Sequence, residues 1–247
     1  MRRLALLPLL ALAAPALAQE AAPQQSQPGQ TFQPPAGCTA YLTVQMSSCT
    51  VSHHFTCEND PAGWQRRVDM DEGGVTYFGA IDGQTEWVES FHVLSQHSEF
   101  LAPNPADPAN FDDLLSKGED HWDFTTNSDQ IGPTRYVGYD KLTGETTTID
   151  GVTLDRTEYA ITAYAPDGSE VWRGTGSEYV SRDWRMFLSG QSSVVVGEDV
   201  EEVDDTPKEF IRPGERGFLS VNPKYGCNEV MSSNDAPLMS PVPGGQG

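Results

Sequence analysis

The chain has 247 residues and a formal net charge of −21 at pH 7, because 36 aspartates and glutamates outnumber 15 lysines and arginines. A surface this acidic repels nucleic-acid phosphates and anionic lipid head groups, so we expect neither a nucleic-acid partner nor attachment to a membrane surface. A basic protein partner or divalent cations suit this charge, and the acid excess also keeps an exported protein soluble.

The N-terminal segment, residues 1–18, has the pattern of a cleavable signal peptide. Arg2 and Arg3 precede an apolar run that is too short to cross a bilayer, and a small-x-small cleavage site ends at Ala18. We expect cleavage after Ala18 and a periplasmic or secreted mature chain. No later stretch is apolar enough to predict a membrane span.

Two segments flank the predicted domain. Residues 19–37 are rich in Gln, Pro, Ala and Gly, and such a composition buries too little surface to offset the entropy of ordering. We therefore expect a disordered linker at 19–37 and, for the same reason, a flexible tail at 229–247. Residues 38–228 are numerous enough for one sizeable core, so we expect a single domain there.

Short runs of alternating apolar and polar residues follow one another along this domain, separated by turn signals such as Asp82-Gly83. We expect strands at 39–46, 50–58, 64–70, 75–82, 85–93, 133–140, 152–164, 170–181, 184–189, 193–197 and 216–221. Strands joined mostly by tight turns predict a mainly β fold built on an antiparallel sheet, as a meander, a sandwich or a half-open barrel.

One predicted strand, 152–164, changes phase in its middle. Its apolar residues occupy even positions up to Leu154 and odd positions from Tyr159 onward. An extra residue would restore a single buried face, so we predict a β-bulge or a sharp bend near residues 155–158.

One short helix is predicted near 108–117, inside a connection at 94–132 that otherwise has no strand pattern. Asp107 can cap the first turn, Pro108 suits the first helical position, and Gly118 suits the position after the last turn. Long irregular connections often carry function or close one end of a sheet.

Four cysteines in an exported chain favour two disulfides. The first two predicted strands alternate in a way that predicts a hairpin with all apolar positions on one face and Cys38 opposite Cys57. Cys49 and Cys57 would lie roughly 26 Å apart on one extended strand. We therefore predict the disulfides Cys38–Cys57 and Cys49–Cys227.

The histidines between two of these cysteines suggest a metal site, but the hairpin argues against it. The alternation places His53 on the apolar face and His54 on the opposite face, so the two cannot hold the same ion. We expect His53 to be an ordinary core residue. The alternative is a copper or zinc site that recruits His92, His97 or His121.

Two acidic runs have simpler explanations than calcium binding. Residues 69–74 resemble the start of a calcium-binding loop, but Ala80 stands where that loop needs a bidentate glutamate, so we expect a tight turn. Residues 198–205 are expected to form a solvated loop or a protected sheet edge, with docking of a basic partner or weak calcium binding as alternatives.

The sequence contains no motif of a zinc hydrolase, a serine hydrolase, a thiol oxidoreductase or a nucleotide-binding protein, so we assign no catalytic residue, metal or cofactor. The most unusual cluster is GEDHWDF at 118–124, where His121 and Trp122 lie between carboxylates. We take Trp122, His121 and His53 as the candidate ligand-binding residues. Tryptophans and tyrosines of a curved sheet could line a pocket with them.

We therefore expect a non-enzymatic, exported β-protein that binds a small apolar ligand or an envelope partner such as a basic protein. Two alternatives come from other classes. One is a periplasmic hydrolase that uses carboxylates or a histidine beneath the connection at 94–132, and the other is a structural subunit that docks through residues 198–205.

Overall fold

The computed structural model describes residues 30–227, so the predicted signal peptide, residues 19–29 and the tail at 229–247 lie outside the described residues. Its elements are β1 (Cys38–Met46), β2 (Val51–Cys57), β3 (Gln65–Asp71), β4 (Gly74–Ile81), β5 (Trp87–His92), β6 (His97–Leu101), α1 (Phe111–Lys117), β7 (Glu119–Asn127), β8 (Thr134–Ile149), β9 (Val152–Tyr164), β10 (Glu170–Ser181), β11 (Met186–Leu188), β12 (Gln191–Val196), β13 (Asp199–Asp204) and β14 (Pro207–Ile211).

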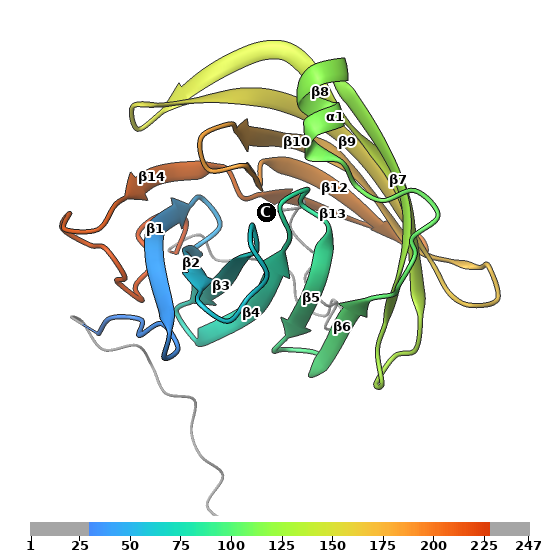
Figure 1. The fold of residues 1–247 in the computed structure, drawn as a ribbon, viewed down its shortest axis with the longest axis horizontal. Helices are drawn as coiled ribbons and strands as arrows, with labels where there is room; N and C mark the ends of the chain where they lie inside the picture. Colours follow the sequence, from blue (N-terminus) through green and yellow to red (C-terminus); the bar gives the residue numbers. More distant parts are fainter. Residues whose placement is uncertain (1–29, 228–247) are drawn as a thin grey trace, which may run out of the picture.

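The strands form one antiparallel sheet in the order β13-β12-β10-β9-β8-β7-β6-β5-β4-β3-β2-β1-β14, with β11 paired to β10. The predicted mainly β fold is therefore confirmed. The sheet curls, and β7–β9 form a curved wall with α1 at its upper rim (Figure 1). The sheet is not a closed barrel, because β13 and β14 are its two edges.

Every predicted strand from 39–46 to 193–197 has a counterpart in the sheet. The strand predicted at 216–221 does not form, and Ser220 makes only an isolated bridge with Thr31. The acidic run is the edge strand β13, which agrees with the expected protected edge, since charged side chains discourage pairing with a further strand.

The connection at 94–132 differs most from its prediction, because it contains β6 and β7 as well as α1. In β7 the side chains of Trp122, Phe124 and Thr126 alternate as buried residues on the inner face. This connection is part of the sheet and not an irregular lid.

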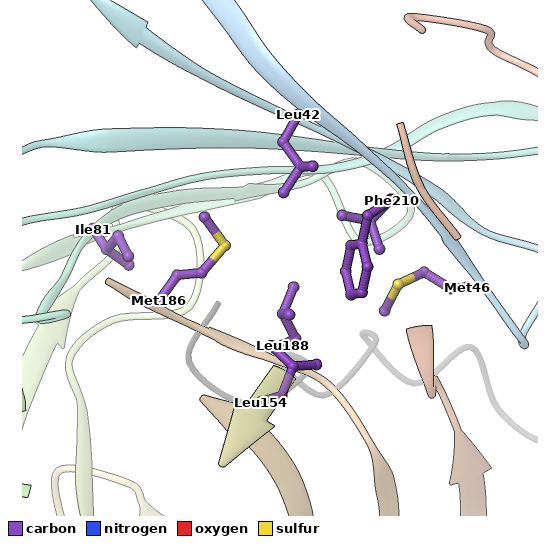
Figure 2. Close-up of a cluster of buried hydrophobic side chains, with 8 residues drawn as sticks. Leu42, Met46, Ile81, Leu154, Met186, Leu188 and Phe210 are labelled. Carbon is purple, nitrogen blue, oxygen red and sulfur yellow. The ribbon is translucent and has the colours of Figure 1, made fainter. Parts of the chain in front are cut away.

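Opposite halves of the sheet pack against each other at one end. Leu42 and Met46 of β1 and Phe210 of β14 point toward Leu154 of β9 and Leu188 of β11 (Figure 2). All five are buried. Full burial of such a side chain contributes about 1.5–3 kcal/mol, so this cluster holds the curled sheet together.

The helix α1 begins later than its sequence pattern suggests. Asn110 is the N-cap, and its side chain accepts a hydrogen bond from the backbone N–H of Asp113 (2.9 Å), whereas Asp107 forms an isolated bridge with Asp123. Gly118 ends the helix in the left-handed conformation, as predicted.

Replacing Asn110 by alanine should lower the free energy of unfolding by about 1 kcal/mol, because one N–H of the first turn loses its acceptor. Chemical denaturation measures this loss. Asp107→Ala is the control and should change stability by less than about 0.5 kcal/mol. A larger loss for Asp107→Ala than for Asn110→Ala would contradict the observed cap.

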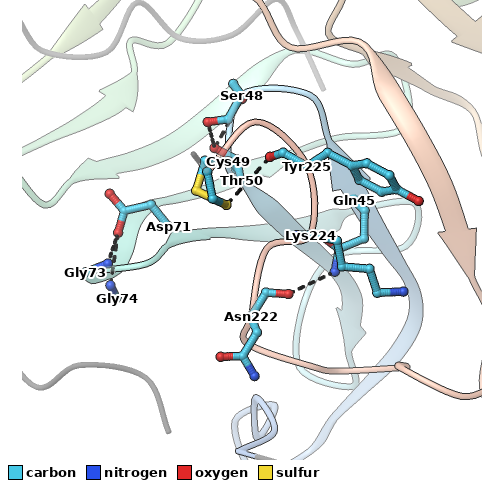
Figure 3. The surroundings of a disulfide bond; sticks show 11 residues. Gln45, Ser48, Cys49, Thr50, Asp71, Gly73, Gly74, Asn222, Lys224 and Tyr225 are labelled. Atoms are coloured by element: carbon cyan, nitrogen blue, oxygen red, sulfur yellow. Dashed lines mark hydrogen bonds between the residues drawn. A yellow bond between two sulfur atoms is a disulfide. The ribbon is translucent and has the colours of Figure 1, made fainter. Parts of the chain in front are cut away.

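Both predicted disulfides are present, Cys38–Cys57 and Cys49–Cys227. The second fastens the C-terminal segment beside β1 (Figure 3), where the N–H of Cys49 donates to the carbonyl oxygen of Tyr225 (2.9 Å). Gln45 strengthens this attachment by accepting from the N–H of Lys224 (2.9 Å).

The first hairpin changes register at a bulge. Cys38 pairs with Cys57 as predicted, but the register shifts between Ala40 and Leu42, so Leu42 lies opposite His54 and not opposite His53. The uniform register expected from alternation is wrong beyond the bulge. As a result His54 shares the inner face with Leu42.

The outer face of β1–β3 is covered by the chain's own terminal segments. Phe32 and Leu219 pack with Ala40, Phe55 and neighbouring apolar residues. The N–H of Phe32 also donates to the carbonyl oxygen of Leu219 (2.7 Å). Residues preceding β1, which composition assigned to a linker, therefore lie against the sheet.

The bulge predicted near residues 155–158 of β9 does not form there, because the extra residues lie on the neighbouring strand β8. Burial in β9 moves from Leu154 to Thr157 and Tyr159. The register between β8 and β9 shifts between Leu142 and Thr146 of β8, while β9 pairs regularly with β10 over these positions. A bulge in β8 thus absorbs the change of face.

Candidate functional site

A groove of about 190 Å³ lies mainly on the outer face of the sheet, over β4–β6. Strand register builds it, because Phe78 pairs with Phe91 across β4 and β5, and Glu89 pairs with Phe100 across β5 and β6. The lining residues are Phe55, Arg66, Arg67, Phe78, Gly79, Glu89, Ser90, Phe91, Ser98 and Phe100.

The groove has an exposed aromatic rim. Phe78 is 40% exposed and Phe100 is 54% exposed, although both are large apolar side chains. The neighbouring outer face of β1–β3 is covered, so the open aromatic surface begins where the chain's own covering segments end. Exposed apolar patches of this kind mark interaction sites.

One wall of the groove is a fixed ion network. Arg66 binds Asp60 through two hydrogen bonds, Nε to Oδ2 (2.6 Å) and Nη2 to Oδ1 (2.9 Å), and also pairs with Glu89. The hydrogen bonds from Arg66 hold the pKa of Asp60 below its usual range. A two-pronged guanidinium–carboxylate pair has restricted geometry, so the polar wall is preorganised.

The inner face carries buried ionisable groups of a different kind. Asp140 accepts a hydrogen bond from Trp122 Nε1 (2.8 Å), and burial raises the pKa of Asp140 to about 7. Burial also raises the pKa of Glu178 well above its usual range, and neither of its carboxyl oxygens has a hydrogen-bond partner within the described chain. Unpartnered buried carboxyls favour their neutral, protonated form.

Arg67 is a buried cation on the inner face. It forms an ion pair with Asp69 (Nε to Oδ2, 3.2 Å) and lies over the ring of Tyr77 (4.9 Å). The hollow beside Arg67, Tyr77 and His54 has a volume of about 10 Å³. That volume admits a single water molecule, so an apolar ligand does not fit there.

The three candidate ligand-binding residues from the sequence lie apart. His53 is buried on the outer face, where it stacks on Phe32 (5.0 Å between centroids) and its Nδ1 lies 3.0 Å from Thr43 Oγ1. Burial lowers the pKa of His53 to about 4. Trp122 is buried on the inner face, and His121 is exposed.

His121 has a simple local environment. Its Nε2 lies 2.9 Å from Glu119 Oε1, and both side chains are exposed. Because His121 and Trp122 are neighbours on β7, their side chains point to opposite faces. The GEDHWDF segment therefore does not form one site.

Within residues 30–227, two groups bring three possible metal-ligand atoms within 4.8 Å of one another. One comprises Glu72 and the two sulfurs of the Cys49–Cys227 disulfide, which are oxidised and unavailable as thiolate ligands. The other comprises His92, His97 and Glu99, all of which are buried. Sequence reasoning considered these two histidines only as additional ligands for His53.

No protein-family model, no curated protein and no solved structure matches this chain. Among residues 30–227, no helix combines the length and the apolar character needed to cross a membrane. Two disulfides indicate an oxidising, extracellular type of compartment.

Proposed function

We propose that this chain is an exported binding protein that receives an apolar anchor side chain of an envelope partner in the outer groove. One observation carries the proposal: Phe78 and Phe100 remain exposed around a groove of about 190 Å³, while the adjoining outer face is covered. The signal-peptide pattern of residues 1–18 supports a periplasmic or secreted location.

The size of the groove favours a protein partner over a small-molecule ligand. Pockets for drug-sized ligands have volumes of roughly 300–1,000 Å³, which is larger than this groove. Binding energy in protein interfaces is concentrated in a few anchor side chains that fill such hollows. Arg66 and Glu89 supply polar groups beside the aromatic rim, as at the boundary of an interface core.

The charge of the chain indicates the kind of partner. With a formal net charge of −21, the surface attracts basic proteins and repels acidic ones, which raises association rates and improves specificity. We therefore propose a basic partner that inserts an aromatic or aliphatic residue between Phe78 and Phe100.

A photo-crosslinking residue tests this proposal in the native cell. Benzoylphenylalanine at position 100 should give one discrete adduct of protein size on ultraviolet illumination. The same residue at Val200 is the matched control, because Val200 is also an exposed apolar residue but lies on β13. Mass spectrometry of the adduct identifies the partner.

Phe100→Ser should then weaken binding of the identified partner about 30-fold, the effect of losing an interface hot spot of about 2 kcal/mol. Val200→Ser should change the affinity by less than twofold. An adduct of a few hundred daltons would indicate a small ligand and contradict the proposal. Equal crosslinking from positions 100 and 200, or none from either, would also contradict it.

A further inference from the structure

We infer that His92, His97 and Glu99 form a binding site for a divalent transition metal ion. The three side chains are 2%, 4% and 6% exposed, and each offers one ligand atom within 4.8 Å of the others. Removing each ionisable group from water costs free energy, so three such groups buried side by side indicate a compensating interaction at this position. This site is separate from the outer groove and does not depend on the partner proposed above.

The β5–β6 hairpin places the three residues together. His92 and His97 are directly opposite each other in the strand register, and their rings stack with centroids 4.4 Å apart. Glu99 follows His97 by two residues, so its side chain lies on the same face of β6. The arrangement thus follows from the backbone and does not require an unusual loop.

The hydrogen bonds of the histidines leave one nitrogen without a partner. His97 Nδ1 lies 2.8 Å from Ser95 Oγ, and His92 Nε2 lies 3.3 Å from Ser90 Oγ. His92 Nδ1 is buried and has no hydrogen-bond partner within the described chain. A buried nitrogen normally has a partner, so an orphan atom beside two further ligand atoms points to a missing ligand.

Glu99 is oriented from the neighbouring strands. Its Oε2 accepts hydrogen bonds from Thr126 Oγ1 (2.5 Å) and Tyr136 Oη (3.0 Å). Its other oxygen, Oε1, lies 3.2 Å from His97 Nε2. Metal ligands typically have such outer partners, which hold the non-ligating atom and aim the other at the ion. All three proposed ligands have them.

The donor set selects the class of metal. Two imidazoles and one carboxylate suit zinc and related transition metals, whereas calcium and magnesium prefer oxygen ligands throughout. Zinc bonds of about 2.0–2.2 Å place neighbouring donors roughly 3.4 Å apart. The pair His97 Nε2 and Glu99 Oε1, at 3.2 Å, is already close to this separation. Because the three ligand atoms lie within 4.8 Å of one another, an approach of His92 by at most about 1.4 Å would complete three ligands.

Metal titration of the purified mature chain tests this inference. After treatment with a chelator, the protein should bind one equivalent of Zn²⁺ by calorimetry, and Co²⁺ in its place should give visible d–d absorption bands. His92→Ala should weaken Zn²⁺ binding at least about 100-fold, beyond the range seen when outer partners are removed. The control His121→Ala should change it by less than twofold, because His121 is exposed and distant in the register.

Two further variants separate metal binding from folding. Glu99→Gln keeps the shape and still accepts hydrogen bonds from Thr126 and Tyr136, yet it should weaken Zn²⁺ binding at least about 10-fold. Thr126→Val removes an outer partner and should weaken binding about 10- to 100-fold. Failure of the wild-type chain to bind Zn²⁺ or Co²⁺ would overturn the inference, as would equal losses in His92→Ala and His121→Ala.

Discussion

Replacing Cys49 and Cys227 together by serine should lower the free energy of unfolding by about 5 kcal/mol. The bond closes a loop with a sequence separation of 178, and long loops gain the most from closure because the unfolded chain loses more conformational freedom. The C-terminal segment that this bond fastens also binds β1 through Gln45. Chemical denaturation of both forms under oxidising conditions measures the loss.

The second disulfide is the internal comparison for this prediction. Cys38 and Cys57 are separated by only 19 residues, so replacing both by serine should cost about 3 kcal/mol. Replacing a cystine by two serines should thus destabilise this protein more at Cys49–Cys227 than at Cys38–Cys57. A larger loss for Cys38 and Cys57 than for Cys49 and Cys227 would show that loop closure does not dominate.

Replacing Asp140 by asparagine should flatten the dependence of stability on pH. The pKa of Asp140 is raised by burial from 3.8 to about 7, so the folded state binds this proton more tightly than the unfolded state does. The resulting stabilisation is complete below the unfolded pKa and is lost as pH rises through about 7. Three pKa units correspond to about 4 kcal/mol.

The difference in unfolding free energy between Asp140→Asn and the wild type should therefore grow by about 4 kcal/mol, in favour of the variant, as the pH rises from 4 to 8. Asparagine can still accept the hydrogen bond from Trp122. The control Asp183→Asn changes an exposed aspartate and should leave the pH dependence unaltered. Thermal unfolding at several pH values measures this difference, and parallel curves for Asp140→Asn and the wild type would contradict the assignment.

The sequence predicted most hairpin strands and the Cys38–Cys57 bond because these are local patterns, and the Cys49–Cys227 bond followed once Cys49–Cys57 had been excluded. It failed at the register of the first hairpin, since both faces of β1 are buried. Thr43 and Gln45 look like surface residues, but they are fully buried and bind the C-terminal segment. Alternation identifies a face only when the other face is solvated.

The groove and the histidine site needed the structure for other reasons. Neither Phe78 nor Phe100 was a candidate site residue, because nothing in the local sequence distinguishes an exposed phenylalanine from a buried one. His92 and His97 lie five positions apart, and only their pairing across the β5–β6 turn brings them together. Glu99 lies on β6, in the connection at 94–132 where no strand was predicted, so its position beside His97 could not be expected.

The pairing of β1 with β14 sets an order for the formation of the molecule. Thr43 pairs with Ile211, and Cys49 is bonded to Cys227. Neither contact can form until nearly the whole chain has been synthesised. During synthesis Cys38, Cys49 and Cys57 emerge first, when Cys49 can only form wrong bonds with its neighbours. Any bond that Cys49 forms before Cys227 arrives must therefore be reopened by thiol–disulfide exchange before the native pair can form.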